Sequence, residues 1–458
     1  MVPGFLDVCE RSYTGPQLSK DDWDVERIVM GVQSKVEEHG LSWDKKNVIP
    51  EDGALLGALF EAARGLLVET GVYNMSTGRV IQLSREEIAS GLAGMHKTLV
   101  MGEGRDSYTL VARAIEDPRP PAIWAGNPGS PTPESLFFPI VRSVVKESVI
   151  DLLTCGSLID VDGFDVRKGD PTEVMAVARE TQYLRRALKE VGRPGMGILG
   201  AESSASEVGD FSAMRPDLLR RCDSHLVAMF NELIVDQGNL VRATAGLQYG
   251  IRNASLACTM VGGLGGDAPG STVLMIASMM AANLVYRADY HLCHPIHINN
   301  IATSDRSCLW LQSALCQAFA AMSPAIIVCD IWPKSGALTR ELLYEVAANS
   351  IVVAVSGGHL EGVGAVDGRV PNGTGLEARL MGEVGKAVAR QRMTRAEANA
   401  IALSLLGKYE HVFTMPGGNP GQRFDVAYDM NTILPVPEWE NMYREVKAEL
   451  ASMGIRFD

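Results

Sequence analysis

The segment AIIVCDIWPK places a carboxylate and an indole ring two residues apart, at Asp330 and Trp332. The apolar run before them predicts a buried β-strand, in which side chains at i and i+2 point to one face about 6.6 Å apart. A carboxylate attracts a cation by its charge, and an indole face attracts one by about 0.5–2 kcal/mol. The pair therefore suits a methylated ammonium ligand. In the alternative interpretation, Asp330 caps a loop and Trp332 packs before Pro333.

The segment GRPGMGILGAESSAS, from Gly192 to Ser206, has the pattern of a buried strand that ends in a polar loop. The last side chain before the loop is Leu199, which cannot act as an acid, a base or a nucleophile. Glu202 follows in the loop, where its carboxylate could face a ligand or cap the next helix. We favour the ligand-facing interpretation.

The segment HLCHPIH contains residue types that bind zinc. In a straight strand His291 and His297 would lie about 20 Å apart, so they cannot share one ion. Cys293 could share a metal with His291, or with His294 if Pro295 bends the chain. We favour hydrogen-bonded histidines that line a barrel, with His297 facing a ligand, and we expect no metal site.

Composition excludes several classes of protein. The chain has 458 residues and a formal net charge of −13, whereas nucleic-acid-binding proteins usually carry a basic face. The apolar segment STVLMIASMMAANLVYRA contains Ser278 and Asn283, so we expect a packed helix rather than a membrane span. No signal peptide is apparent, and the eight cysteines lack paired short spacings. We expect a cytoplasmic protein with reduced thiols, and no nucleic-acid or membrane partner.

These candidate residues need a scaffold, and the pattern from Ala122 onward supplies one. Short apolar runs alternate with helical patterns, which is typical of a parallel sheet with helical crossovers. Eight strands are predicted, in AIWAGNPG, VIDLLTCGS, GMGILGAES, SHLVAMFNE, ASLACTMVGG, DYHLCHPIHIN, AIIVCDIWP and HLEGVGAV. Eight such units favour an α/β fold of the (β/α)8 TIM-barrel type, with an open doubly wound sheet as the alternative. Between the third and fourth strands only the short MRPDLLRRC is available as a helix.

The ends of the chain have a different pattern. We expect a helical extension over residues 1–118, the barrel over 119–425 and a helical tail over 426–458. The extension contains the helical patterns DDWDVERIVMGVQSKVEEHG, DGALLGALFEAARGLLVETG and SREEIASGLAGMHKTLV. Chemistry in such a barrel lies at the carboxyl ends of the strands. Those positions are Asn127, Cys155, Leu199, Leu226, Leu256, His297, Asp330 and Trp332.

Several strings resemble one family of enzymes over nearly the whole chain. GRPGMG at Gly192, CDSH…NEL at Cys222 and GLEARLMGEV at Gly375 closely resemble the corrinoid-dependent monomethylamine methyltransferases. Shorter matches are GVY, GRD, GSP and HL…P.HI. The resemblance implies a (β/α)8 barrel that passes a methyl group from an amine to the Co(I) of a separate corrinoid protein. It also implies a homo-oligomer, and archaeal members of the family serve methanogenesis.

The resemblance gives Leu199 a particular meaning. Archaeal family members carry pyrrolysine at the position that matches Leu199, and its imine is thought to bind the amine. Leu226 and Leu256 match glutamates that contact pyrrolysine, Asp330 matches a glutamine and Trp332 a tyrosine. Glu202 matches a family acid. Five changes together indicate a site rebuilt for another ligand, without pyrrolysine.

The chemistry of the donor links these changes. A neutral primary amine is a poor methyl donor because its leaving group is an amide anion, whereas a quaternary ammonium leaves as a neutral amine and needs only positioning. We therefore expect a methylated, preferably quaternary, amine as substrate. Asp330 and Glu202 are the expected catalytic residues, and Leu199, Leu226, Leu256, His297 and Trp332 are expected to bind the substrate.

The corrinoid is expected to come from a cognate corrinoid protein, with no cofactor bound tightly by this chain. The glycine strings GGLGGDAPG and VSGGHLEGVG are expected to be loops that let the corrinoid domain approach closely. Two alternatives remain open: a metal-assisted methyltransferase for a non-amine donor, and a silent barrel that only binds corrinoid proteins.

Overall fold

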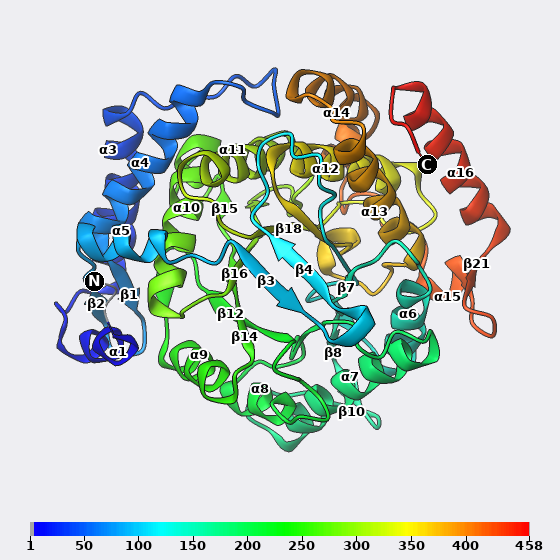
Figure 1. Ribbon diagram of the computed structural model, residues 1–458, viewed down its shortest axis with the longest axis horizontal. Helices are drawn as coiled ribbons and strands as arrows, with labels where there is room; N and C mark the ends of the chain where they lie inside the picture. The colour runs from blue at the N-terminus through cyan, green and yellow to red at the C-terminus, as the bar shows by residue number, and fades with distance from the viewer. Residues whose placement is uncertain (1–3, 458) are drawn as a thin grey trace.

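Eight parallel strands form the centre of the computed structural model, which describes residues 4–457 (Figure 1). They lie in the order β11-β12-β14-β16-β18-β19-β5-β7, and a parallel bridge between Leu153 and Ile198 joins the two ends of the sheet. The predicted barrel and its eight strands are confirmed. Their bounds are β5 (Ile123–Ala125), β7 (Leu152–Leu153), β11 (Leu199–Gly200), β12 (Ser224–Met229), β14 (Arg252–Ala257), β16 (Tyr290–Cys293), β18 (Ile327–Ile331) and β19 (His359–Gly362).

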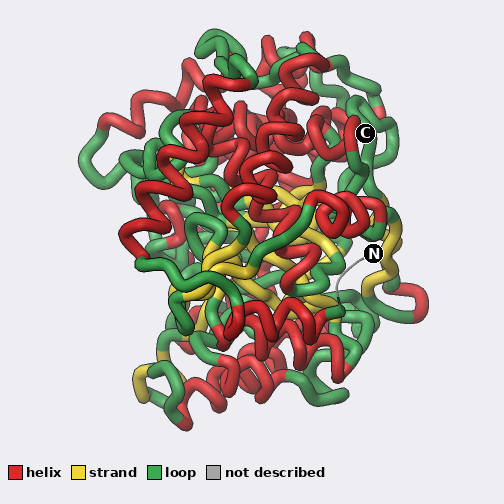
Figure 2. Tube along the Cα trace, turned by 90° about the vertical axis from the view of Figure 1, so that its left-hand side faces the viewer, coloured by secondary structure: helices red, strands yellow, loops and turns green. Residues whose placement is uncertain are grey.

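Helices surround the strands, as the side view shows (Figure 2). The crossover helices are α6 (Glu134–Val145), α7 (Pro171–Glu190), α8 (Glu207–Ala213), α9 (Gln237–Tyr249), α10 (Ala268–Val285), α11 (Arg306–Met322), α12 (Arg340–Ser356) and α13 (Gly375–Arg390). Most begin at an N-cap whose side chain accepts a backbone N–H, as Asp236 does for α9 and Thr339 for α12.

The helix expected within MRPDLLRRC lies elsewhere. The crossover between β11 and β12 contains α8, which begins after its N-cap Ser206 and ends at Ala213. Residues from Met214 onward form turns instead, because Pro216 offers no backbone N–H and disfavours helical geometry at Arg215.

Side chains that point inward fill the amino-terminal half of the barrel. Trp124 and Tyr290 stack there with ring centroids 5.4 Å apart, and both are almost fully buried. Leu152, Leu199 and Val328 belong to the same interior cluster, which is separate from the larger core between the strands and the helices. The barrel is therefore solid at this end.

A hairpin closes the amino-terminal end of the barrel. It consists of β3 (Thr98–Met101) and β4 (Tyr108–Val111), which lie across the near end of the barrel in Figure 1. The predicted helix through this region ends early, since α5 covers only Arg85–Ala93. The alternation of exposed and buried residues in β3 has the period of a strand, and Leu99, Met101 and Leu110 join the interior cluster.

The remaining elements lie outside the barrel strands. The N-terminal region contains α1 (Phe5–Thr14), α2 (Lys20–Asp22), η1 (Trp23–Val29), α3 (Met30–Glu38) and α4 (Gly53–Thr70), with β1 (Val72–Asn74) and β2 (Arg79–Ile81). The C-terminal region contains α14 (Arg395–Tyr409), η4 (Glu410–Thr414), α15 (Phe424–Ala427), β20 (Tyr428–Asp429), β21 (Leu434–Pro435) and α16 (Pro437–Ser452). The loops hold η2 (Gly104–Asp106), β6 (Pro131–Thr132), β8 (Ser157–Leu158), β9 (Asp160–Val161), β10 (Phe164–Asp165), β13 (Ile234–Val235), β15 (Met260–Val261), β17 (Ile296–His297) and η3 (Val366–Gly368).

Helix α10 is long and apolar enough to cross a membrane by length and composition, but 94% of it is buried inside the fold. It packs against α4 and α11. This agrees with the expected packed helix. The proposed boundaries at residues 118 and 425 stay a prediction, and the expected C-terminal helix is present as α16.

The hairpin predicts a clear contrast between two adjacent residues. Leu99→Ala empties a buried site, and the expected loss in the free energy of unfolding is about 2–5 kcal/mol. Val100 is half-exposed, so Val100→Ala is the matched control and should change stability by no more than about 0.5 kcal/mol. Urea denaturation measures both. Equal effects would contradict the hairpin's role as a closure of the interior.

Candidate active site

A cavity of about 240 Å³ lies at the carboxyl ends of the barrel strands. This is the end at which barrel enzymes hold their catalytic groups. Its lining residues are Pro128, Gly129, Glu202, Leu226, Leu256, Cys258, Leu292, His294, Ile296, Asp330, Trp332 and Glu361. They come from the ends of seven strands or the loops that follow, and among them is no lysine or arginine.

One side of the cavity is apolar. Leu226, Leu256 and Leu292 pack on the interior cluster and present their remaining surface to the cavity. The neighbouring Cys258 has a pKa that burial raises to about 12, so its thiol stays protonated at neutral pH. This side offers van der Waals contact and excludes water.

The other side holds Asp330 and His294. The Asp330 Oδ2 atom lies 2.7 Å from His294 Nδ1, and both side chains are buried. Burial lowers the pKa of His294 to about 4 and raises that of Asp330 to about 6. At neutral pH the imidazole is therefore uncharged and Asp330 is ionised. The second carboxylate oxygen, Oδ1, has no hydrogen-bond partner among the described residues.

Glu361 is a site residue that the sequence analysis missed. It is 1% exposed, and its Cα pairs in register with that of Asp330 on the neighbouring strand. Burial, with the adjacent negative charge of Asp330, raises the pKa of Glu361 well above its ordinary value. The position was available from the sequence, since HLEG was predicted as the eighth strand and glutamate is its one acid.

Glu202 is held in the cavity by a second set of acids on α7. The Glu180 carboxylate accepts the backbone N–H groups of Glu202 and Ser203, at 3.2 and 2.7 Å. Glu173 accepts those of Ala205 and Ser206 in the same loop. Burial and the charge of Glu361, followed by those of Glu180 and Asp330, raise the pKa of Glu202 well above its usual range.

The loop that carries Trp332 is fixed in a similar way. Glu345 on α12 accepts the backbone N–H groups of Lys334 and Ser335, at 2.7 and 3.0 Å. The backbone N–H of Trp332 donates to Thr303 Oγ1 at 2.8 Å. The indole ring meets the His294 ring edge-to-face, with centroids 4.4 Å apart. Both side chains of the sequence-predicted pair, Asp330 and Trp332, thus face one cavity.

Glycines make room for this indole. A Cβ atom at Gly364 would lie 2.5 Å from Trp332 Nε1, and one at Gly368 would lie 2.5 Å from the outer ring carbons. Gly129 lies against the same ring. Part of the glycine string VSGGHLEGVG therefore serves the packing of Trp332 inside this chain. Its expected role in the approach of a partner stays a prediction.

Two expected ligand-binding residues lie outside the cavity lining. Leu199 is 1% exposed and belongs to the interior cluster beneath the cavity. His297 lines a separate surface hollow with Trp43 and Arg306, and its Nδ1 lies 3.8 Å from Asp305. The chain turns after His294, which enters the cavity, so His297 does not line it; a role for His297 at the ligand stays a prediction.

His291 is hydrogen-bonded as expected, but the expectation that it lines the barrel was wrong, because its neighbours Tyr290 and Leu292 fill the interior and its own side chain points outward. Its Nδ1 lies 2.8 Å from the Ser255 hydroxyl, and burial lowers its pKa to about 3. Cys293 packs in the outer core. Cys329 also packs in the outer core and lies 3.5 Å from Cys316 on α11, sulfur to sulfur. Among residues 4–457 no group of three or more His, Cys, Asp or Glu side chains is arranged to hold a metal ion.

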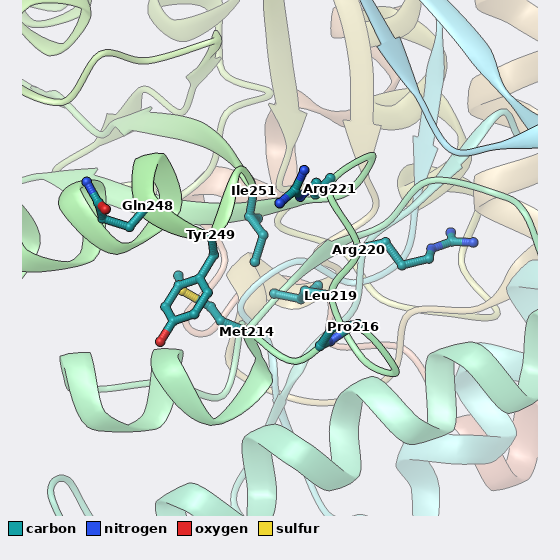
Figure 3. Close-up of a pocket in the computed structure, with 8 residues that line it drawn as sticks. All are labelled: Met214, Pro216, Leu219, Arg220, Arg221, Gln248, Tyr249 and Ile251. Atoms are coloured by element: carbon teal, nitrogen blue, oxygen red, sulfur yellow. The ribbon is translucent and has the colours of Figure 1, made fainter.

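A larger hollow of about 430 Å³ lies at the opposite end of the strands (Figure 3). It is bounded by Leu219 before β12, Ile251 before β14 and Tyr249 at the end of α9. Its lining contains arginines but no carboxylate, histidine or thiol. We therefore place the chemistry in the cavity at the carboxyl ends.

The packing around Trp332 predicts that a methyl group added at Gly364 lowers the stability of the fold. Gly364→Ala forces the indole to move, and the expected loss is about 1–3 kcal/mol in the free energy of unfolding, with a shift in tryptophan fluorescence. Gly407→Ala in helix α14 is the control, since a Cβ atom at that position would meet nothing within 4 Å. That change should stabilise the fold by about 0.5–1 kcal/mol. An unshifted spectrum in the Gly364 variant would contradict the described contact.

Comparison with known proteins agrees with this architecture. The family model for monomethylamine methyltransferase MtmB matches residues 4–455. Monomethylamine methyltransferase MtmB of Methanosarcina mazei is 31% identical over 458 residues, and MtmB1 of Methanosarcina barkeri is 30% identical over 457; each alignment covers 98% of both chains.

The crystal structure of the Methanosarcina barkeri enzyme superposes with a TM-score of 0.95 at 30% identity, covering 99% of this chain and 98% of that one. A crystal structure of the hydroxylamine MtmB complex matches equally well. Together with the barrel and its acidic cavity, these matches show that the chain is a methyltransferase and belongs to the monomethylamine methyltransferase MtmB family.

Proposed function

We propose that this chain transfers a methyl group from a quaternary ammonium compound to the corrinoid of a separate corrinoid protein. One observation carries the proposal: acids, an indole ring and an apolar wall surround one small cavity that contains no lysine or arginine among its lining. A buried negative charge without a partner is costly, so the site is completed by a cationic ligand.

In this proposal some lining residues attract the cation by charge and others contact it by shape. Asp330 supplies the negative charge, and Trp332 supplies a ring face that attracts a methylated cation. Leu226, Leu256 and Leu292 contact the methyl groups and keep water from the reacting carbon. Leu199 fills the space beneath, and we propose that it replaces the pyrrolysine that other family members carry.

Positioning is the main contribution that such a donor requires. When a methyl group leaves a quaternary ammonium, the electron pair of the C–N bond stays on nitrogen and the leaving group is a neutral tertiary amine. No covalent helper is needed, so the barrel has only to hold the cation with its methyl group oriented toward the corrinoid nucleophile. The corrinoid is a co-substrate brought by the partner, and no tightly bound cofactor of this chain enters the proposal.

The partner surface is proposed around the cavity mouth. Half-exposed apolar side chains occur in the loops that follow β12, β14 and β16, namely Phe230, Leu264 and Ile298. Apolar residues exposed next to a reactive cavity are typical of a binding surface for another protein. A homo-oligomeric assembly is a further proposal that rests on the family alone.

A second donor class has one observation in its favour. Asp330 Oδ1 and both carboxylate oxygens of Glu361 receive no hydrogen bond from the described residues. A quaternary ammonium has no N–H group to donate, whereas a protonated amine such as methylammonium does. The formation of methyl-corrinoid is measured by absorbance, with tetramethylammonium and methylammonium as donors in parallel assays. The result decides between a quaternary and a protonated amine donor. Turnover of methylammonium alone would refute the quaternary donor.

The indole ring should contribute measurably to cation binding. Trp332→Ala removes a contact of about 0.5–2 kcal/mol, which is about two- to thirty-fold in the dissociation constant of tetramethylammonium. Trp332→Phe is the matched control, because it keeps an aromatic face and should lose less. Isothermal titration calorimetry measures all three proteins. An Ala variant that binds as tightly as the wild type would remove Trp332 from the site.

The affinity for tetramethylammonium should depend on pH. Burial raises the pKa of Asp330 to about 6, so its carboxyl group is neutral below that pH and charged above it. Affinity should therefore fall up to tenfold per pH unit as the pH drops below about 6. The Asp330→Asn variant should bind more weakly than the wild type at pH 7 to 8 and should not show the wild-type decline centred near pH 6. Calorimetric titrations between pH 5 and pH 8 test both statements, and an Asn variant with the wild-type profile would contradict them.

A further inference from the structure

Asp330 and Glu361 form a pair of adjacent carboxyl groups in the cavity. They are Cα partners on the parallel strands β18 and β19, and both line the cavity. Their side chains are 4% and 1% exposed. Two carboxyl groups so close in a low-dielectric environment do not both ionise at neutral pH, because like charges raise the cost of the second ionisation.

The hydrogen-bond partners around Asp330 and Glu361 are compatible with one proton held between the two carboxyl groups. His294 occupies one Asp330 oxygen, while the other Asp330 oxygen and both oxygens of Glu361 lack a partner among the described residues. An unpaired buried carboxylate would be costly, and a carboxylic acid next to a carboxylate resolves this by donating its O–H. The pair then carries one negative charge and one proton.

No lysine or arginine lines the cavity to compete for that proton. The titratable groups that face the pair across the cavity are Glu202, Cys258 and His294, with Tyr290 and Cys155 close behind. Burial keeps Cys258 protonated and His294 neutral at pH 7. Outside the cavity lining, the charge of Arg242 lowers the pKa of Glu202, but burial and the neighbouring carboxylates raise it by more.

We propose that Asp330 and Glu361 share one proton, and that Glu361 gives this proton to the nitrogen of the departing amine. The inference rests on the proposed methyl transfer from an amine. The C–N bond breaks and its electron pair stays on nitrogen, while the cobalt nucleophile of the partner supplies the electron pair of the new bond to carbon. The nitrogen lone pair then takes the carboxyl proton, leaving an ammonium ion and two carboxylates, and water returns the proton after release.

The shared proton has one effect before the reaction, on the charge of the site, and another after it, on the amine product. The single charge of the pair balances the single charge of the bound cation. Protonation of the amine product prevents it from attacking the methyl group again, so the transfer is drawn forward. The proton moves only after the C–N bond has broken, so its effect is to block the return of the methyl group and thereby to raise the net rate of transfer.

Two donors of equal charge distinguish proton donation from cation binding. Tetramethylammonium releases a basic amine, whereas trimethylsulfonium releases dimethyl sulfide, which is too weakly basic to take a proton. Glu361→Gln should lower the net rate of methyl-corrinoid formation from tetramethylammonium, because the neutral amine product can then take the methyl group back. From trimethylsulfonium the rate should stay at the wild-type value. Equal losses with both donors, or none with either, would overturn the proposal.

The pH profile with tetramethylammonium gives a second readout that does not need the sulfonium. The wild-type rate should decline as the pH rises far enough to remove the shared proton, and this decline should be absent in Glu361→Gln. Glu232→Gln is the matched control, because Glu232 is a buried carboxyl at the same end of the barrel, outside the cavity lining, with a pKa raised to about 7 by burial. It should keep the wild-type profile. A decline that persists in the Glu361 variant would refute the role.

Binding separates a failure of this inference from a failure of the proposed function. If the wild type neither binds nor demethylates any methylated cation, both the proposed function and this inference are refuted. If wild-type turnover is normal and Glu361→Gln matches it with both donors, only the shared proton is refuted. Infrared difference spectra of wild type and variant should also show that the variant lacks one protonated carboxyl band, and an unchanged band would count against the pair.

Discussion

Three carboxyl groups share one small cavity in which no lining residue is a lysine or arginine. Glu202, Asp330 and Glu361 arrive there from three strands, and each has a pKa raised by burial. Water cannot screen them well at this depth, so each charge raises the cost of the next. The rest of the site follows from this constraint, since the net charge of the empty cavity must stay small.

Buried glutamates on two surrounding helices hold the loops that carry Glu202 and Trp332. Glu180 on α7 accepts N–H groups from the loop that carries Glu202, and Glu345 on α12 does the same for the loop that carries Trp332. Each helix thus fixes the loop it neighbours through a buried glutamate. Loops are usually the mobile parts of a barrel, and this arrangement gives them the rigidity that a positioned site requires.

The sequence was sufficient for the barrel because strand and helix periods alternate clearly after residue 122. It also placed Asp330 and Trp332 on one face, since the i, i+2 rule needs only a strand. It did not show where one strand ends: after Cys293 the chain turns, so His294 enters the cavity and His297 does not. Glu361 could have been identified from the eighth strand, whereas the partnership with Asp330 depends on register between strands, which periodicity does not define.

The hairpin of β3 and β4 has a consequence for the sequence of events. With Leu99 and Met101 sealing one end and Trp124 stacked on Tyr290 beneath the cavity, small molecules have no passage through the barrel. In the methyl transfer proposed above, the donor, its demethylated product and the corrinoid partner would all approach from the carboxyl end. Loading would then precede docking and the spent amine would wait for undocking, so each cycle would require the two proteins to separate.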